Sequence, residues 1–283
     1  MADWRTDTTR ALPREIRVAV RAMWALGDYN RIATELYLQL GRDLVEACRI
    51  GPGQRVLDVG AGTGNVAIRA AELGADVVAS DITVENMEAG EREARRRGIE
   101  LEWVEGDAQA LPFADAEFDI VTSSAGAMFA PDQEAVADEL LRVCRPGGTI
   151  GMANFTAGGL AADFFGLLGP YLPPPPPDAP SPLSWGDETH VRALFGERVS
   201  SLDASKRDLV ETIPGTPADY RDLYKQNFGP VVAAYAGVED DPERSAALDR
   251  DFLDYVTRAN RGSPDGPTEL RYEYLLVVAR KSS

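Results

Sequence analysis

Hydrophobic residues near the start of the chain recur every three to four positions, which is the period of an amphipathic helix. They stand at Ile16, Val20, Met23, Trp24, Ile32, Leu36, Leu40 and Leu44. The pattern predicts helices over residues 13–49. Gly51-Pro52-Gly53 follows. Because glycine and proline interrupt helices, we expect the helical segment to end there.

Residues 55–154 alternate between short apolar runs and longer stretches of helical spacing. The runs predict buried strands at residues 55–59, 76–80, 101–104, 118–122 and 149–154. Helices are predicted between them at residues 65–74, at residues 83–97 and from residue 131 to about 145, with Thr83 as a candidate N-cap. Because parallel strands are joined by helical crossovers, this alternation predicts a parallel sheet with helices on both faces.

The last third of the chain predicts two more strands around a helical insertion. Residues 199–210 and 272–279 are strand-like, and residues 214–268 carry apolar residues at helical spacing. We therefore expect a helical cap at residues 1–50, a core of residues 51–213 and 269–283, and a helical insertion at residues 214–268 over the ligand-binding edge of the sheet. Five consecutive prolines at residues 173–177 predict a stiff connector, the alternative being a docking peptide.

The strongest chemical signal is a glycine-rich turn after the first predicted strand. It has the sequence Asp58-Val59-Gly60-Ala61-Gly62-Thr63-Gly64. Glycines allow a tight turn and a close approach of a ligand to the backbone, and the following helix presents unpaired N–H groups. Asp81 ends the second strand, 21 positions after Gly60. A carboxylate at that place can accept hydrogen bonds from both hydroxyls of a ribose.

Two classes of nucleotide cofactor bind at such a turn. Dinucleotides require the spacing G-x-G-x-x-G, whereas the spacing here is G-x-G-x-G. Further motifs follow in order, namely Glu105-Gly106-Asp107-Ala108, Leu111-Pro112-Phe113, Phe118-Asp119-Ile120-Val121 and Leu141-Arg142-Val143-Cys144-Arg145-Pro146-Gly147-Gly148. With these motifs, residues 30–155 resemble the class I S-adenosylmethionine-dependent methyltransferases, in particular those of ubiquinone and menaquinone biosynthesis and of small metabolites.

The resemblance implies an α/β, Rossmann-like fold with a mostly parallel seven-stranded sheet, S-adenosyl-L-methionine as cofactor and S-adenosyl-L-homocysteine as product. The cofactor-binding residues that it implies are Asp58, Gly60, Ala61, Gly62, Asp81, Ile82, Asp107, Ala108 and Ser124. Asp81 would hold the ribose, and Asp107 would accept the adenine amino group. The alternative for these two acids is a structural role at a strand end or a helix cap.

Methyl transfer requires an acceptor atom held in line with the methyl group, about 3 Å away, with water excluded. A general base contributes only where the acceptor must lose a proton. The candidates for the acceptor pocket are Trp24, Tyr29, Met128, Phe129, Phe155, Trp185 and Tyr255. Tyr29 and His190, the single histidine, are the candidate catalytic residues. The alternatives are core packing for the aromatic residues and an incidental surface position for His190.

The charge and composition narrow the set of partners. The formal net charge is −17, and because an acidic chain repels polyphosphates, we expect no nucleic-acid partner. Apolar runs are too short to span a membrane, and the first residues lack the apolar core of a signal peptide, so we expect no membrane partner and a cytoplasmic location. Cys48 and Cys144 suggest neither a disulfide nor a metal site, and no bound metal is predicted.

The predicted function is transfer of a methyl group from S-adenosyl-L-methionine to a small molecule by in-line SN2 displacement. The expected acceptor is an aromatic or heterocyclic metabolite of the natural-product or quinone type. One alternative is a non-catalytic cofactor-binding or interaction protein. A nicotinamide-dependent oxidoreductase is a further alternative, which the glycine spacing disfavours. The sequence is also compatible with a homodimer.

Overall fold

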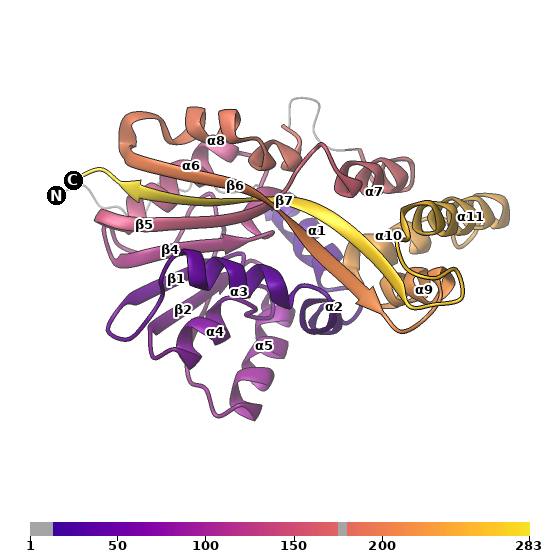
Figure 1. Cartoon of the computed structure of the whole chain (residues 1–283), viewed down its shortest axis with the longest axis horizontal. Helices are drawn as coiled ribbons and strands as arrows, with labels where there is room; N and C mark the ends of the chain where they lie inside the picture. Colours follow the sequence, from indigo (N-terminus) through magenta and orange to yellow (C-terminus); the bar gives the residue numbers. More distant parts are fainter. Residues whose placement is uncertain (1–13, 175–179) are drawn as a thin grey trace.

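The computed structural model describes residues 14–174 and 180–283, and in that part of the chain seven strands form one sheet (Figure 1). The strands are β1 (Arg55–Val59), β2 (Asp76–Asp81), β3 (Glu102–Glu105), β4 (Phe118–Ser124), β5 (Cys144–Phe155), β6 (Val199–Ile213) and β7 (Thr268–Lys281). Their order is β3-β2-β1-β4-β5-β7-β6, and β7 runs antiparallel to both of its neighbours. The predicted mostly parallel seven-stranded sheet is confirmed.

The central strands form because their apolar runs are buried on both faces of the sheet. Val56, Leu57 and Val59 of β1, and Ile120 and Val121 of β4, are each 3% exposed or less. β1 pairs in parallel with β2 on one side and with β4 on the other. The strand order therefore reverses between β1 and β4. In open α/β sheets, ligands bind in the crevice at the carboxyl ends of such strands.

Helices cover both faces of the sheet (Figure 1). On one face lie α3 (Leu38–Ala47), α4 (Ala67–Glu72) and α5 (Val84–Arg96), and on the other α6 (Gln133–Val143) and α8 (Glu188–Phe195). Asp132 caps α6, because its side chain accepts a hydrogen bond from Ala135 N at 2.9 Å. Thr83 stands at the N-cap of α5, but its side chain makes no capping hydrogen bond to the described residues. The prediction of Thr83 as a side-chain cap is therefore wrong.

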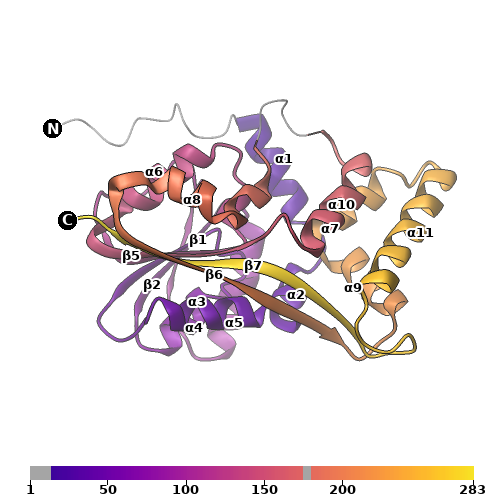
Figure 2. The same ribbon diagram turned by 45° about the horizontal axis from the view of Figure 1, so that its top comes forward.

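The remaining helices gather beyond the carboxyl ends of the central strands (Figure 2). They are α1 (Arg14–Trp24), α2 (Tyr29–Glu35), α7 (Leu160–Leu168), α9 (Pro217–Asn227), α10 (Gly229–Ala236) and α11 (Pro242–Ala259). Glycines let two helix corners touch backbone to backbone. A Cβ on Gly27 would lie 2.8 Å from the backbone of Asn227, and one on Gly229 would lie 2.3 Å from Met23 O. The N-terminal helices thus pack directly against the 214–268 insertion.

The last two strands form a hairpin that reaches beyond the rest of the sheet (Figure 1). β6 and β7 stay paired as far as Ile213 and Thr268, whereas β5 stops pairing with β7 at Phe155. The predicted strands at residues 199–210 and 272–279 are therefore too short at this end. Buried residues alternate with exposed ones in the extension, and Glu211 occupies an inward position. The extension carries Glu211 toward α9, where the Glu211 carboxylate accepts a hydrogen bond from Tyr224.

Other predictions about organisation have mixed outcomes. The helical run at residues 13–49 is three helices, because the chain turns at Gly27, whose φ is +75°, and again at Tyr37. The division into caps and core stays a prediction. Of the five prolines, those at positions 175–177 lie outside the described residues.

Candidate active site

The glycine-rich turn after β1 packs against the turn after β4. Gly60 and Gly62 have φ values of +65° and +56°, where a side chain would strain the backbone. A Cβ on Gly60 would also lie 2.8 Å from the backbone of Gly126. Ala125, just before Gly126, has a φ of +47°, a strained conformation of the kind that is frequent at functional sites. Bare backbone is thus required where the ends of β1 and β4 meet.

Asp81, at the end of β2, anchors this turn. Its side chain is buried, with 9% exposed. One carboxylate oxygen accepts a hydrogen bond from Gly62 N and the other from Thr83 N, each at 2.7 Å. Burial raises the pKa of Asp81, and the backbone donors oppose that increase. A carboxylate has about four acceptor positions, so Asp81 keeps acceptor capacity for a ligand.

Asp58, the residue before the last of β1, connects the turn to the neighbouring strand and to the following helix. Its Oδ1 accepts a hydrogen bond from Thr122 Oγ1 of β4 at 2.9 Å, and its Oδ2 accepts one from Ala67 N, the first residue of α4, at 3.2 Å. Burial raises its pKa to about 7, and these two donors oppose that increase. Asp58 therefore joins β1, β4 and the helix that follows the turn.

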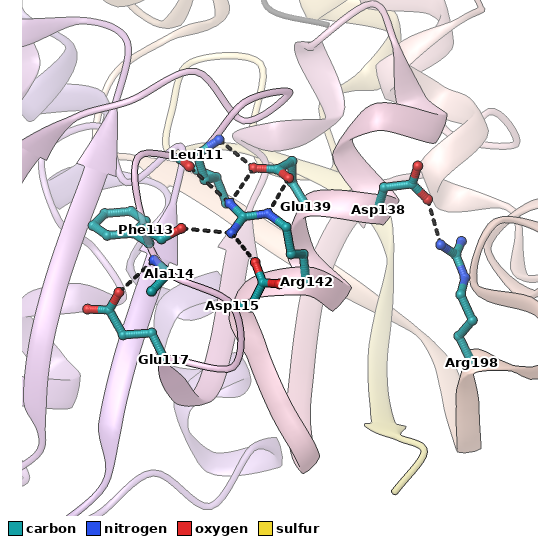
Figure 3. Close-up of polar contacts among 9 residues, drawn as sticks. All are labelled: Leu111, Phe113, Ala114, Asp115, Glu117, Asp138, Glu139, Arg142 and Arg198. Carbon is teal, nitrogen blue, oxygen red and sulfur yellow. Dashed lines mark hydrogen bonds and ion pairs between the residues drawn. The ribbon is translucent and has the colours of Figure 1, made fainter. Parts of the chain in front are cut away.

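Arg142 of α6 holds the loop after β3 in place, as Figure 3 shows. Its guanidinium donates hydrogen bonds to Phe113 O at 2.7 Å and to Leu111 O at 3.0 Å. The same group pairs with Glu139 at 2.6 Å and with Asp115 at 2.8 Å. The Glu139 carboxylate in turn accepts a hydrogen bond from Leu111 N at 2.6 Å. Arg142 and Glu139 thus fix the part of the loop that follows Asp107 and Ala108.

These segments line a crevice with about 700 Å³ of empty space. Six of the predicted cofactor residues line it, namely Gly60, Gly62, Asp81, Ile82, Asp107 and Ala108. The other three, Asp58, Ala61 and Ser124, line an adjoining cavity beneath the turn. Residues that are widely separated in the sequence are thus brought to one edge of the sheet.

A second cavity lies next to the crevice and is named the aromatic cavity here. It shares Trp24, Tyr29, Ala125 and Phe129 with the crevice. Its other lining residues are Tyr37, Phe155, Ala161, Phe164, Phe165, Tyr224, Phe228 and Tyr272. The ring of Tyr29 stands over the glycine turn, since a Cβ on Gly62 would lie 3.2 Å from Tyr29 Cε1. Aromatic walls of this kind suit a flat, apolar ligand and can stabilise a nearby cation.

Four predicted site residues lie elsewhere. Met128 and Trp185 are fully buried in the hydrophobic core. Tyr255 lines an outer groove between α7 and α11. His190, on α8, has its Nε2 atom 2.7 Å from Gln133 Oε1 of α6. The structure therefore brings none of these four to the crevice or to the aromatic cavity, and Tyr29 is the predicted catalytic residue that lies there.

Glu211, a buried carboxylate near the aromatic cavity, is not among the site residues that the sequence predicts. Glu211 Oε2 accepts hydrogen bonds from the hydroxyls of Tyr220 and of Tyr224, the latter at 2.8 Å. Its Oε1 has no hydrogen-bond partner among the described residues. Burial raises the pKa of Glu211 to about 7, and the two phenols oppose that increase. The available signal was an acid at an inward position between Leu209 and Ile213, followed by tyrosines one helical turn apart.

The cysteines and acids of the described residues form no metal centre. In residues 14–174 and 180–283, no three His, Cys, Asp or Glu side chains are grouped so that they could hold a metal ion. Cys48 and Cys144 are buried free thiols. Burial raises the pKa of Cys48 to about 12 and that of Cys144 to about 11. Thiols of that kind are unreactive.

The chain is similar to several known proteins. Residues 57–152 match the family described as "Methyltransferase domain". A demethylmenaquinone methyltransferase of Renibacterium salmoninarum is 43% identical over 115 residues, which are 41% of this chain and 47% of that relative. The chain belongs to the class I S-adenosylmethionine-dependent methyltransferases.

Two further comparisons cover most of the methyltransferase. An uncharacterised protein of Mycobacterium tuberculosis is 42% identical over 275 residues, 97% of this chain and 98% of the relative. The crystal structure of the YcgJ protein of Bacillus subtilis has the same fold, with a TM-score of 0.59 and 17% identity over 87% of this chain and 99% of that one.

The predicted activity and cofactor are confirmed. The methyltransferase uses S-adenosyl-L-methionine and transfers its methyl group to a small-molecule acceptor. None of the helices in the described residues is both long enough and apolar enough to cross a membrane.

Proposed function

We propose that the crevice holds S-adenosyl-L-methionine with its ribose on Asp81. The buried carboxylate of Asp81 carries this proposal, because it lines the crevice beside the glycine turn and carboxylate oxygens suit the two ribose hydroxyls. The bare backbone of Gly60 and Gly62 leaves room for the methionine part. Asp107 and Ala108 would accept from the adenine amino group and donate to the ring, and Ile82 would pack on it.

We also propose that the aromatic cavity holds the methyl acceptor. Its walls favour an aromatic or heterocyclic metabolite of the natural-product or quinone type. The name of the Renibacterium relative, which refers to demethylmenaquinone, supports a quinone-type acceptor. Because Tyr29 lines both the crevice and the aromatic cavity, it would position the acceptor beside the cofactor.

The bound cofactor supplies an electrophilic methyl group on a positively charged sulfur. In this proposal, the chain orients the acceptor in line with that group and keeps water out. The rings of Trp24 and Phe129, whose centroids are 4.9 Å apart, line both the crevice and the aromatic cavity and would flank the place where the two ligands meet. Aromatic faces there also stabilise positive charge.

Further proposals concern the location of the protein, its partners and its division into domains. We propose that the protein is cytoplasmic, as its polar first residues suggest. We also propose that it has no nucleic-acid partner, because its net charge of −17 repels polyphosphates. The division into two helical caps and a core gains support from the aromatic cavity, because Tyr29 comes from residues 1–50 and Phe228 from residues 214–268. A homodimer stays a prediction.

Calorimetric titration with S-adenosyl-L-methionine tests the assignment of the ribose. Asp81→Ala should weaken binding by about 1–3 kcal/mol, because the ribose hydroxyls lose a charged acceptor. Asp76→Ala is the matched control, since this residue lies at the other end of β2 in an exposed ion pair with Arg55 and should leave binding unchanged. Unchanged affinity in Asp81→Ala would show that the ribose lies elsewhere. To test the acceptor class, the release of S-adenosyl-L-homocysteine is measured in reactions with a panel of quinols, phenols and heterocycles.

A further inference from the structure

Five residues form a connected polar group where the β6–β7 hairpin extends beneath α9. They are Glu211, Tyr220, Tyr224, Tyr272 and Tyr37, and they are named the Glu211 cluster here. Each is 8% exposed or less. Besides the bonds to Glu211, Tyr220 and Tyr272 bring their hydroxyl oxygens within 3.3 Å, and Tyr37 and Tyr224 bring theirs within 3.4 Å. The rings of Tyr220 and Tyr224 are stacked, with centroids 4.9 Å apart.

The Glu211 cluster reaches the aromatic cavity through its phenols. Tyr37, Tyr224 and Tyr272 line that cavity. Tyr37 also lines the cavity beneath the glycine turn, together with Gly60 and Gly62. A chain of hydroxyl contacts therefore runs from the neighbourhood of the cofactor crevice, through Tyr37 and Tyr224, to the buried carboxylate.

Counting hydrogens shows what this group can bind. Each phenol has one hydrogen to donate, and Tyr220 and Tyr224 both donate theirs to Glu211. Tyr255 donates its own to Leu160 O at 3.2 Å, so the 2.9 Å contact between Tyr272 and Tyr255 is donated by Tyr272. By the same logic Tyr37 donates to Tyr224. Lone pairs then remain for a ligand, together with Glu211 Oε1, which lacks a partner among the described residues.

A group with spare acceptors selects a ligand that donates a hydrogen bond. A carboxylate or a phosphate would meet only lone pairs and a buried acid, whereas a hydroxyl would complete the arrangement. Buried polar atoms without partners are rare and call for an explanation. A purely structural group could have filled the place of Oε1 with an apolar atom at little cost.

We propose that the Glu211 cluster takes up the proton of a hydroxyl-bearing aromatic acceptor, with Tyr37 and Tyr224 as the relay. The inference rests on the proposed binding of an aromatic acceptor in the aromatic cavity. The acceptor oxygen gains the methyl group, whose bond to sulfur breaks with the electron pair staying on sulfur. The hydroxyl proton passes to the oxygen of Tyr37, the proton of Tyr37 passes to Tyr224, and that of Tyr224 passes to the Glu211 carboxylate.

The chemistry of the acceptor explains why such a relay favours oxygen. A neutral amine attacks through its lone pair before it loses a proton, so it gains little from a base. A neutral hydroxyl is a weak nucleophile until its proton leaves, and a positioned base contributes about 100-fold or more to such steps. The groups that face Glu211 are phenols from α2, α9, α11, β7 and the segment between α2 and α3. The pKa of Glu211, raised to about 7 by burial, suits a proton acceptor in neutral solution. Glu211 is a positioning residue in this scheme, because it acts through Tyr224.

Kinetics with ring-substituted phenols test the proposal. S-adenosyl-L-homocysteine release is measured with probes from 4-methoxyphenol, a weak acid, to 4-nitrophenol, which is largely ionised in neutral solution. With 4-methoxyphenol, Glu211→Gln should lower kcat about 100-fold and leave KM nearly unchanged. With 4-nitrophenol the loss should shrink to a few-fold. In the unaltered protein kcat should fall as the pH is lowered, because Glu211 becomes protonated. This fall should be absent from Glu211→Gln.

Two further variants complete the design. Glu273→Gln is the matched control, because this acid lies on β7 at the surface, where it binds Lys206 at 2.9 Å, and it should leave all rates unchanged. Tyr37→Phe removes only the first relay oxygen and should show the same selective loss, so the test stands even where Glu211→Gln folds poorly.

Several results would overturn the proposal. An equal loss with every phenol would indicate a structural role for Glu211, and no loss would show that it takes no part. If the unaltered protein methylates quinones or amines but no phenol, the acceptor class named here is wrong and the proposed function stands. Absence of cofactor binding in calorimetry would instead refute the proposed crevice, and this inference with it.

Discussion

Replacing Glu211 by glutamine should change how the stability of the protein depends on pH. The carboxyl has a pKa of about 7 in the folded chain against an ordinary value of 4.5, because burial disfavours its charge. Between these values the folded state holds a proton that the unfolded state has lost. The unaltered protein therefore loses stability as the pH rises from about 4.5 to about 7, and the full penalty persists above that range.

The size of the effect follows from the two pKa values. A difference of about 2.5 units, at about 1.4 kcal/mol per unit, corresponds to roughly 3 kcal/mol. Glutamine has no charge to bury, and its amide oxygen can still accept from Tyr220 and Tyr224. The free energy of unfolding of Glu211→Gln, relative to the unaltered protein, should therefore increase by about 3 kcal/mol across this range.

Urea denaturation at a series of pH values measures this difference. Asp58 also has a pKa raised to about 7, and it contributes to the pH dependence with the same sign. Because Asp58 is present in both proteins, its contribution cancels in the comparison. A difference in stability that does not change with pH, or one that shrinks as the pH rises, would refute the reasoning, since it would mean that Glu211 is ionised throughout.

Two other pairs of variants test the site. Gly60→Ala should cost about 1–3 kcal/mol more in urea denaturation than Gly53→Ala, because both have positive φ but Gly53 has open space around its Cβ position; equal costs would contradict the crowding at Gly126. Arg142→Met should lower stability by about 2 kcal/mol, since two backbone carbonyls lose a charged donor, and should speed amide hydrogen exchange in the loop after β3. Arg145→Met, which removes a half-exposed ion pair, should cost about 0.5 kcal/mol or less, and an equal cost for both would show that Arg142 does not hold the loop.

The parts of the fold that sequence predicts well are those where local pattern and burial coincide. β1 has the bounds that were predicted, because its apolar run is buried on both faces and the glycine turn ends it. β6 and β7 extend farther than predicted, because their outer residues in the extension are polar and exposed and weaken the apolar pattern. The pairing with each other, a contact between distant segments, sets their length.

The residues of the candidate site also differ in how well the sequence predicts them. Asp81 and Gly60 could be found because each stands at a strand end within a short motif. Glu211 could not, because its importance comes from Tyr220, Tyr224 and burial beneath α9, which only the folded chain brings together. Trp185 is predicted for the acceptor pocket as an aromatic residue, but composition does not reveal which face of an element a ring occupies. In the structure it is fully buried in the core.

The origin of the rings around the aromatic cavity has a consequence for how such enzymes diverge. These rings come from the helices and loops beyond the carboxyl edge and from the ends of β5 and β7, whereas the crevice depends on β1, β2 and the loop after β3. Mutations outside the four shared residues can therefore remodel the aromatic cavity while the crevice keeps its shape. A descendant enzyme can then accept a different compound while the residues that bind the methyl donor stay unchanged. Trp24, Tyr29, Ala125 and Phe129, which border both compartments, are where such freedom should be smallest.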